Sequence, residues 1–283
     1  MVILQNEYLK ARFNESGAEM KSLIYNDKEY IWYGDDKFWC RSAPLMFPIC
    51  SGLRDDEFIY EGKTYTLNKH GYARVTMFDV VSATDTSVTF VHKSNEETKK
   101  CYPFDYELYV TYTLIDKTVK VEYNVKNLTD GDMYMSIGAH EAYLCPEGIE
   151  EYDVIFPAPE TLYSSVIEGN LIGKQRELII ENSDTIALKY DYFKVDALVF
   201  KELKARSVTL RNRNNGKAVK VEFPGFDYFL IWTKPDAPYV CLEPWCGIND
   251  NTDSDKNFKT KEGIHRIEKG GTFNRVHTLE ILA

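Results

Sequence analysis

Apolar and polar side chains alternate with a period of two residues along much of this chain, and this pattern constrains its fold most. The alternation is strict over residues 108–114 and again over residues 119–126, with a turn at Asp116-Lys117 between them. Successive side chains of a strand point to opposite faces, so the pattern predicts an antiparallel hairpin with one buried face. A second hairpin is expected around Asn214-Asn215-Gly216, between residues 208–210 and 219–223.

The rest of the chain favours the same class of structure. Further strands are expected at residues 87–92, 132–138, 197–200, 228–232, 239–243 and 275–282. No long segment shows the apolar stripe of a helix, and the 20 tyrosines and 15 phenylalanines suit pleated sheets better than helices. We therefore predict an all-β fold with very little helix, a large antiparallel β-sandwich. Without a linker or repeat, residues 1–283 are expected to form a single domain, and Pro146-Glu147-Gly148 is interpreted as a loop.

Charge and composition exclude several classes of partner. The formal net charge of −10 argues against nucleic-acid binding, which needs a clustered basic face. It does not exclude a local basic pocket for one sugar phosphate. No apolar run approaches the ~18 residues of a membrane helix, so no membrane partner is expected. No signal peptide is recognised at the N-terminus, and the six cysteines lack C-x-x-C spacing. These features favour a cytoplasmic protein with reduced thiols.

Three short segments at expected strand ends carry groups suited to acid–base chemistry. They are residues 69–74, 137–143 and 241–247, and they contain His70, His140 and Glu243. Two imidazoles and one carboxylate, supplied by different strands of a β scaffold, can form one acid–base site. The alternative for each of the three is an ordinary structural role at a turn or a strand end.

Glu243 shares one face of its expected strand with Tyr239 and Cys241. Because Pro244 cannot donate a ladder hydrogen bond, the strand is expected to stop there. The carboxylate would then stand at a strand end between Tyr239 and Trp245. Aromatic rings beside a carboxylate are typical of sugar pockets, since the C–H faces of a pyranose pack on rings. A solvated glutamate at a strand end fits the pattern equally well.

The two histidines have different local settings. His140 has the parity of the polar residues in the expected strand 132–138, and Gly138 beside it would let a ligand or another backbone approach closely. His70 precedes Gly71, which predicts a sharp turn that projects the imidazole ring. Arg74 would add a planar fork of donors for hydroxyls, a carboxylate or a phosphate. The other histidines, His92, His265 and His277, are interpreted as structural.

Two acidic groups and a loop remain ambiguous. Arg54-Asp55-Asp56 follows an expected strand and glycine turn at residues 47–52, and Asp196 precedes the apolar strand 197–200. Aspartates in such places commonly cap turns. The acidic loop 249–255 lacks the spacing of an EF-hand and is expected to be solvated. The histidines are too scattered to indicate a metal site, and no phosphate-binding loop or serine-nucleophile motif is present.

Taken in order along the chain, these segments resemble the aldose 1-epimerase (galactose mutarotase-like) family, in particular its bacterial branch related to the LacX protein. The resemblance extends over nearly the whole chain. Its most specific motifs are Phe47-Pro48-Ile49, His70-Gly71-Tyr72-Ala73-Arg74, Gly138-Ala139-His140, Asp196-Ala197-Leu198 and Glu243-Pro244-Trp245.

The resemblance implies a β-supersandwich with the site on a concave sheet face. It also implies interconversion of the α and β anomers of an aldohexose, without a metal or any other cofactor. By matching motifs, Glu243 corresponds to the general base, His140 to the general acid and His70 to a second active-site histidine. Asp196 corresponds to a carboxylate that binds sugar hydroxyls, and Trp245 is expected to contact the substrate.

Two positions depart from the family pattern. Where relatives carry a substrate-binding Gly-Arg after the Phe-Pro strand, this chain has Ser51-Gly52, which leaves Arg54 and Arg74 as candidates. Glu141 stands where many relatives have proline after the histidine. Its carboxylate is expected either to raise the pKa of His140 or to point to solvent.

Three alternatives stay open beside the mutarotase. A hexose-6-phosphate 1-epimerase would use Arg54 and Arg74 to clasp the phosphate. A non-catalytic sugar-binding sandwich would bind a sugar without converting it. A glycoside hydrolase built on Glu243 and Asp196 would leave both histidines unexplained. The expected partner is a small aldose or sugar phosphate, while the particular sugar and the oligomeric state, monomer or homodimer, stay open.

Overall fold

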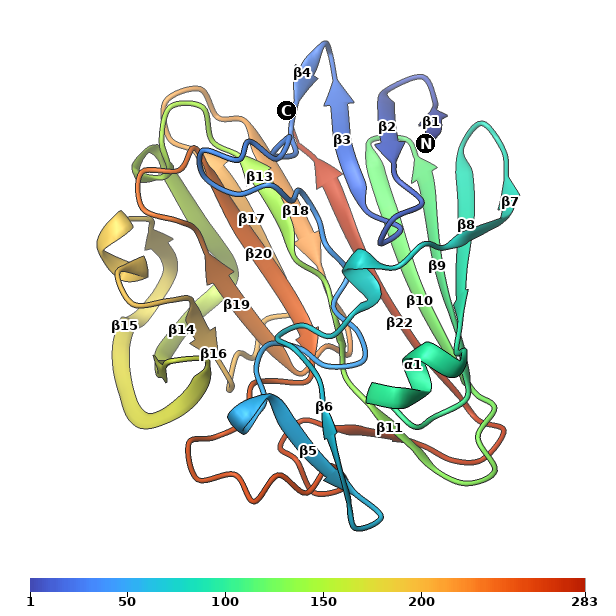
Figure 1. Ribbon diagram of the computed structural model, residues 1–283. Helices are drawn as coiled ribbons and strands as arrows, with labels where there is room; N and C mark the ends of the chain where they lie inside the picture. The colour runs from blue at the N-terminus through green and yellow to red at the C-terminus, as the bar shows by residue number, and fades with distance from the viewer. Residues whose placement is uncertain (283) are drawn as a thin grey trace.

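A nine-stranded antiparallel sheet is the largest part of the computed structural model, which describes residues 1–282 (Figure 1). Its strands follow in the spatial order β15 (Leu171–Ala187), β14 (Tyr152–Glu168), β17 (Ser207–Asn212), β18 (Ala218–Glu222), β22 (Thr272–Ile281), β10 (Thr118–Asn127), β9 (Tyr106–Ile115), β8 (Ser87–Lys93) and β7 (Asp79–Ala83). Both hairpins expected from the sequence are present, as β9–β10 and β17–β18. Burial alternates residue by residue along β9 and β10, which confirms the prediction that one face of this hairpin is buried.

A second sheet carries most of the chemically interesting residues. It contains β12 (Ile137–Gly138), β20 (Tyr239–Cys246), β19 (Tyr228–Trp232) and β16 (Leu198–Phe200) in that order, and β13 (Glu141–Leu144) also pairs with β20. One apolar cluster joins the two sheets, since Val121 and Leu279 of the large sheet belong to it together with Val240 and Leu242 of β20. The all-β antiparallel sandwich predicted from the sequence is therefore confirmed. The single-domain assignment stays a prediction.

Smaller elements surround the two sheets. They are the four-stranded sheet β1 (Val2–Gln5), β2 (Leu9–Phe13), β3 (Met20–Tyr25) and β4 (Lys28–Glu29), the pair β5 (Glu57–Tyr60) and β6 (Lys63–Thr66), and the pair β11 (Met133–Met135) and β21 (His265–Ile267). The α-helix α1 (Glu96–Cys101) begins with a capping box at Asn95, and the 3₁₀ turns are η1 (Arg54–Asp56), η2 (Ala73–Val75), η3 (Ile149–Glu151) and η4 (Tyr190–Phe193). Among residues 1–282, no helix has the length and apolar character needed to cross a membrane.

The expectation that a strand ends before Pro244 is wrong, because β20 runs on to Cys246. The carbonyl of Pro244 accepts a hydrogen bond from the amide of Ala139 (3.1 Å), so the proline nitrogen faces the same side of the strand. The register between Gly138–Trp245 and Glu141–Leu242 places Ala139 opposite Pro244, and the Ala139 carbonyl accepts a hydrogen bond from the Trp245 indole N–H (3.2 Å). A side-chain donor therefore replaces the missing N–H of the proline.

Candidate active site

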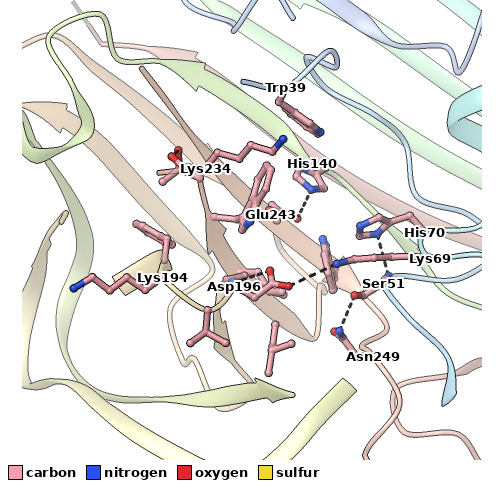
Figure 2. Close-up of a pocket in the computed structure, with 18 of the residues that line it drawn as sticks. Trp39, Ser51, Lys69, His70, His140, Lys194, Asp196, Lys234, Glu243 and Asn249 are labelled. Atoms are coloured by element: carbon pink, nitrogen blue, oxygen red, sulfur yellow. Dashed lines mark hydrogen bonds and ion pairs between the residues drawn. The ribbon is translucent and has the colours of Figure 1, made fainter. Parts of the chain in front are cut away.

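A cavity of about 500 Å³ lies on the face of β19 and β20 that points away from the shared core. Even-numbered residues of β20, such as Val240 and Leu242, pack in that core, whereas Glu243 and Trp245 face the cavity. The cavity is lined by all the candidate residues from the sequence except Arg54, namely His70, Arg74, His140, Asp196, Glu243 and Trp245. Three distant segments thus meet at one place, as Figure 2 shows.

Glu243 and His140 form the centre of this site. The His140 Nε2 atom lies 3.3 Å from a carboxylate oxygen of Glu243 (Figure 2), and the two residues are 7% and 1% exposed. His140 reaches the carboxylate because the register that β12 and β13 share with β20 places it opposite Glu243, so the two side chains project from the same face of the sheet. The position of Gly138 next to β20 is also explained, since a Cβ there would lie 2.7 Å from the Trp245 ring.

Burial acts on the two groups in opposite directions, because it disfavours the charged form of each. Burial raises the pKa of Glu243 well above its usual range, and the Asp196 carboxylate adds to this effect. Burial, together with smaller contributions from Lys69 and Arg74, lowers the pKa of His140 to about 3. The pair therefore holds one exchangeable proton, which rests on the carboxyl group rather than on the imidazole.

His70 presents a neutral N–H group to the cavity. Its Nδ1 atom accepts a hydrogen bond from the Ser51 amide (3.1 Å), so the single proton of the neutral ring lies on Nε2. Burial and the neighbouring His140 hold the pKa of His70 well below its usual range, which keeps the ring neutral. The sharp turn expected here is present: His70 has φ +67°, and a Cβ on Gly71 would lie 2.3 Å from the Phe47 carbonyl oxygen.

Asp196 acts at a turn and also faces the cavity. One carboxylate oxygen accepts a hydrogen bond from the Ala197 amide (2.8 Å), which is the capping role that aspartate commonly has. The other oxygen lies 3.7 Å from the Lys69 ammonium, which also donates to the side chain of Asn170 (3.1 Å) (Figure 2 draws the first contact). The capping and cavity roles expected for Asp196 are therefore compatible.

The two candidate arginines differ in position. Arg74 lines the cavity from η2, and its guanidinium donates to the Lys69 carbonyl (2.8 Å). Arg54 lies outside the cavity lining, because the tight turn η1 directs its guanidinium to the Ser254 carbonyl (2.8 Å). The expectation that Arg54 contacts substrate is corrected accordingly, and Arg74 is the arginine that can reach a ligand.

Both expectations for Glu141 are wrong. The residue is 3% exposed and pairs in register with Leu242, so it points into the core on the opposite face from His140. There its carboxylate lies 2.9 Å from His277 Nε2 of β22. Glu141 does not reach solvent, the pKa of His140 is lowered rather than raised, and the Glu141 carboxylate instead contributes to the raised pKa of Glu243.

The loop 249–255 is only partly solvated, contrary to expectation. Asn249 and Asp250 are 1% and 3% exposed, because this part of the loop packs beneath the cavity. The Asn249 amide donates to the Ser51 hydroxyl (2.6 Å), and the Asp250 carboxylate lies 3.2 Å from the buried Lys261 ammonium. Asn249 thereby supports the segment that positions His70.

Several cavity residues have no signal in the sequence. Trp39, from the irregular segment after β4, packs against His140 with ring centroids 5.0 Å apart and ring planes tilted by 32°. Four cationic side chains also line the cavity, Lys69, Arg74, Lys194 and Lys234, although the chain as a whole is acidic. They come from segments with no common periodicity, so this concentration of positive charge emerges only from the fold.

Comparison with known proteins agrees with this architecture. The model of the aldose 1-epimerase family matches residues 1–262. The chromosomal protein LacX of Lactococcus lactis subsp. lactis is 34% identical over 294 residues, which cover 99% of this chain and 98% of LacX. A galactose mutarotase related enzyme from Lactobacillus acidophilus superposes with a TM-score of 0.95 at 32% identity, covering 100% of this chain and 97% of that one. A galactose mutarotase-like protein from Lactobacillus casei gives 0.94 at 29% identity, covering 99% of both chains.

Proposed function

The chain belongs to the aldose 1-epimerase family and is a carbohydrate isomerase of the mutarotase type, and we propose that it interconverts the α and β anomers of an aldohexose. The observation that carries this proposal is the contact between Glu243 and His140 at a cavity of hexose size. Ring opening needs one proton removed from the anomeric hydroxyl and one delivered to the ring oxygen. A pair that holds a single exchangeable proton suits both tasks.

In the proposed reaction the resting proton first crosses from Glu243 to His140 over their 3.3 Å contact. Glu243 then takes the proton from O1 while the His140 imidazolium protonates O5, and the C1–O5 bond breaks to give the open aldehyde. Rotation about C1–C2 exposes the other carbonyl face. On closure Glu243 returns a proton to the carbonyl oxygen while His140 takes the O5 proton, and the proton on His140 then crosses back to Glu243.

The remaining cavity residues would hold the sugar in register. The neutral His70 donates through Nε2, and the Asp196 carboxylate accepts from ring hydroxyls. Trp245 offers an aromatic wall for the C–H face of the pyranose, and Arg74 supplies further donors. Such positioning converts a proton transfer between separate molecules into one within a complex, and orientation of this kind contributes several kcal/mol to catalysis.

Polarimetry on freshly dissolved α-glucose and α-galactose tests the proposal, with the spontaneous rate subtracted. The protein should accelerate the change in rotation, and Glu243→Gln and His140→Asn should each lower kcat by about 10²–10⁴-fold. Saturable binding of a sugar without accelerated mutarotation would instead assign the chain to the sugar-binding sandwiches. Undiminished catalysis in both variants would remove Glu243 and His140 from the mechanism.

A phosphorylated aldohexose is a second candidate substrate, because four cationic groups line the cavity. Lys194, which lies 2.9 Å from the Asp191 carboxylate, and Lys234 are not needed for the acid–base steps, so either could bind an anionic substituent. If the substrate carries a phosphate, Lys234→Ala should raise KM for glucose 6-phosphate by about tenfold and leave glucose turnover unchanged. Equal effects on both sugars would favour the unphosphorylated substrate.

A further inference from the structure

A buried thiol lies beside the acid–base pair and has no part in the proposed reaction. Cys241 precedes Glu243 by two residues on β20, so both side chains project from the same face of the strand. Cys241 Sγ, a His140 ring nitrogen and a Glu243 carboxylate oxygen all lie within 4.8 Å of one another, and the three residues are buried. The segment thus brings a sulfur, a nitrogen and an oxygen donor to one point.

These three donors are the ligand types that zinc prefers. Zinc sites that remain reactive use three protein ligands and leave the fourth position open, and a thiolate selects for thiophilic metals over magnesium or calcium. Zinc bonds of about 2.0–2.3 Å place neighbouring ligand atoms roughly 3.3–3.8 Å apart in a tetrahedron. The His140–Glu243 contact of 3.3 Å already has this spacing. Cys241 Sγ, within 4.8 Å of both, is the third donor, and the cavity that His140 and Glu243 line provides the open position.

We propose that His140, Cys241 and Glu243 bind one thiophilic divalent cation of the zinc class, which blocks the sugar site. The binding part of the proposal stands on geometry alone, whereas the inhibition rests on the proposed function. A bound cation would occupy His140 and Glu243, so neither could transfer a proton to or from a sugar. Binding would release the Cys241 thiol proton and the proton held by the His140–Glu243 pair to solvent.

The surroundings indicate a reversible inhibitor site rather than a permanently filled one. Histidines that hold a resident metal usually donate their second ring N–H to a carboxylate, carbonyl or water. Within residues 1–282, the buried Nδ1 atom of His140 has no hydrogen-bond partner. The lack of this supporting hydrogen bond lowers the affinity and favours exchange.

A second group of potential ligands has to be separated from this one in the experiment. Asp227, Cys246 and His265 also bring donor atoms within 4.8 Å of one another, and Asp227 is exposed. The Cys246→Ala variant removes the thiol from that group and serves as the parent protein. Cys145→Ala, made in this parent, is the matched control, because Cys145 is another fully buried free cysteine.

The test measures Zn²⁺ binding to the full chain by isothermal titration calorimetry. Cys241→Ser in the Cys246→Ala parent should weaken binding by about tenfold or more, since even the loss of a group that only orients a ligand costs this much. Cys145→Ala should leave the affinity unchanged. With Co²⁺ in place of Zn²⁺, the parent should show a thiolate-to-cobalt charge-transfer band that Cys241→Ser lacks.

A sugar assay links binding to inhibition. Zn²⁺ should inhibit mutarotation by the parent, a saturating sugar should relieve this, and Cys241→Ser should stay active at Zn²⁺ concentrations that stop the parent. Unchanged Zn²⁺ affinity in Cys241→Ser, or no thiolate band in the parent, would overturn the site. If the chain binds Zn²⁺ through Cys241 but shows no mutarotation, only the proposed function fails, so the two failures are distinguishable.

Discussion

Two histidine–glutamate pairs meet at consecutive residues of this chain, and they have different surroundings. His140 lies 3.3 Å from Glu243 at the cavity, whereas Glu141 lies 2.9 Å from His277 between the two sheets. The first pair is bordered by Lys69 and other cationic groups, and the second packs against aromatic rings of the core. Both pairs consist of a histidine and a glutamate. Only the His140–Glu243 pair can be reached by a ligand in the cavity and has cationic neighbours, so these two features, not the residue types, distinguish the pairs.

The difference follows from the alternation of side chains along one segment. Gly138 pairs with Trp245 and Glu141 with Leu242, so the same register places His140 opposite Glu243. Consecutive residues of an extended chain point to opposite faces, so His140 turns to the cavity and Glu141 to the core. Glu141 therefore points away from the cavity, although it directly follows His140 in the sequence.

Replacing the two glutamates separately gives the largest expected contrast. Glu243→Gln should lower mutarotase kcat by about 10²–10⁴-fold, because an amide cannot accept the anomeric proton. Glu141→Gln, which has nearly the same size, should keep kcat within a few-fold of wild type. Polarimetry on both purified proteins measures this contrast. A comparable loss in Glu141→Gln would show that the core pair also takes part in catalysis.

The free energy of unfolding should be affected in the opposite order, with the loss at Glu141 rather than at Glu243. Glu141→Ala leaves His277 without its partner in the core and should lower the free energy of unfolding by about 3 kcal/mol. Glu243→Gln should raise it at pH 7–8. The raised pKa of Glu243 means that its contribution to stability is complete below pH 4.5 and is lost as the pH rises. Urea denaturation monitored by tryptophan fluorescence gives both values. A lower free energy of unfolding in Glu243→Gln at pH 7–8 would contradict the raised pKa of the Glu243 carboxyl group.

The acid side of the pH profile reports on His140. Its pKa of about 3 lies below the usual 6.5, so folding favours the neutral ring. Its contribution to stability is complete above pH 6.5 and is lost as the pH falls towards 3, at up to about 1.4 kcal/mol per pH unit. Thermal unfolding between pH 7 and 4 should therefore depend less on pH in His140→Asn than in wild type. Parallel curves would show that His140 is already protonated in the native protein.

The smallest effect is expected from replacing Trp39, whose ring packs against His140. Trp39→Leu removes this indole but no reacting group, so KM should rise by about tenfold or less with little change in kcat. The midpoint of thermal unfolding should stay close to that of wild type. A large fall in kcat instead would mean that Trp39 sets the orientation of the imidazole.

Regular strands were predictable, and irregular ones were not. The β9–β10 hairpin follows from strict alternation, whereas β14 and β15 went unpredicted although they are the longest strands. Pro157 and Pro159 interrupt the pattern of β14, and the pairing of the two strands shifts register several times between Ile155 and Ile167. Bulges of this kind break the two-residue period on which sequence interpretation depends.

Local patterns in the chain were enough to assign the two hairpins β9–β10 and β17–β18, the turn at His70 and the face shared by Cys241 and Glu243. Each of these depends on residues close together in sequence, where the geometry of a strand or turn is fixed. The exclusion of Arg54, the withdrawal of Glu141 and the gathering of Lys69, Arg74, Lys194 and Lys234 depended on the packing of distant segments. The same packing buries Glu243 and His140, and burial sets where their shared proton rests.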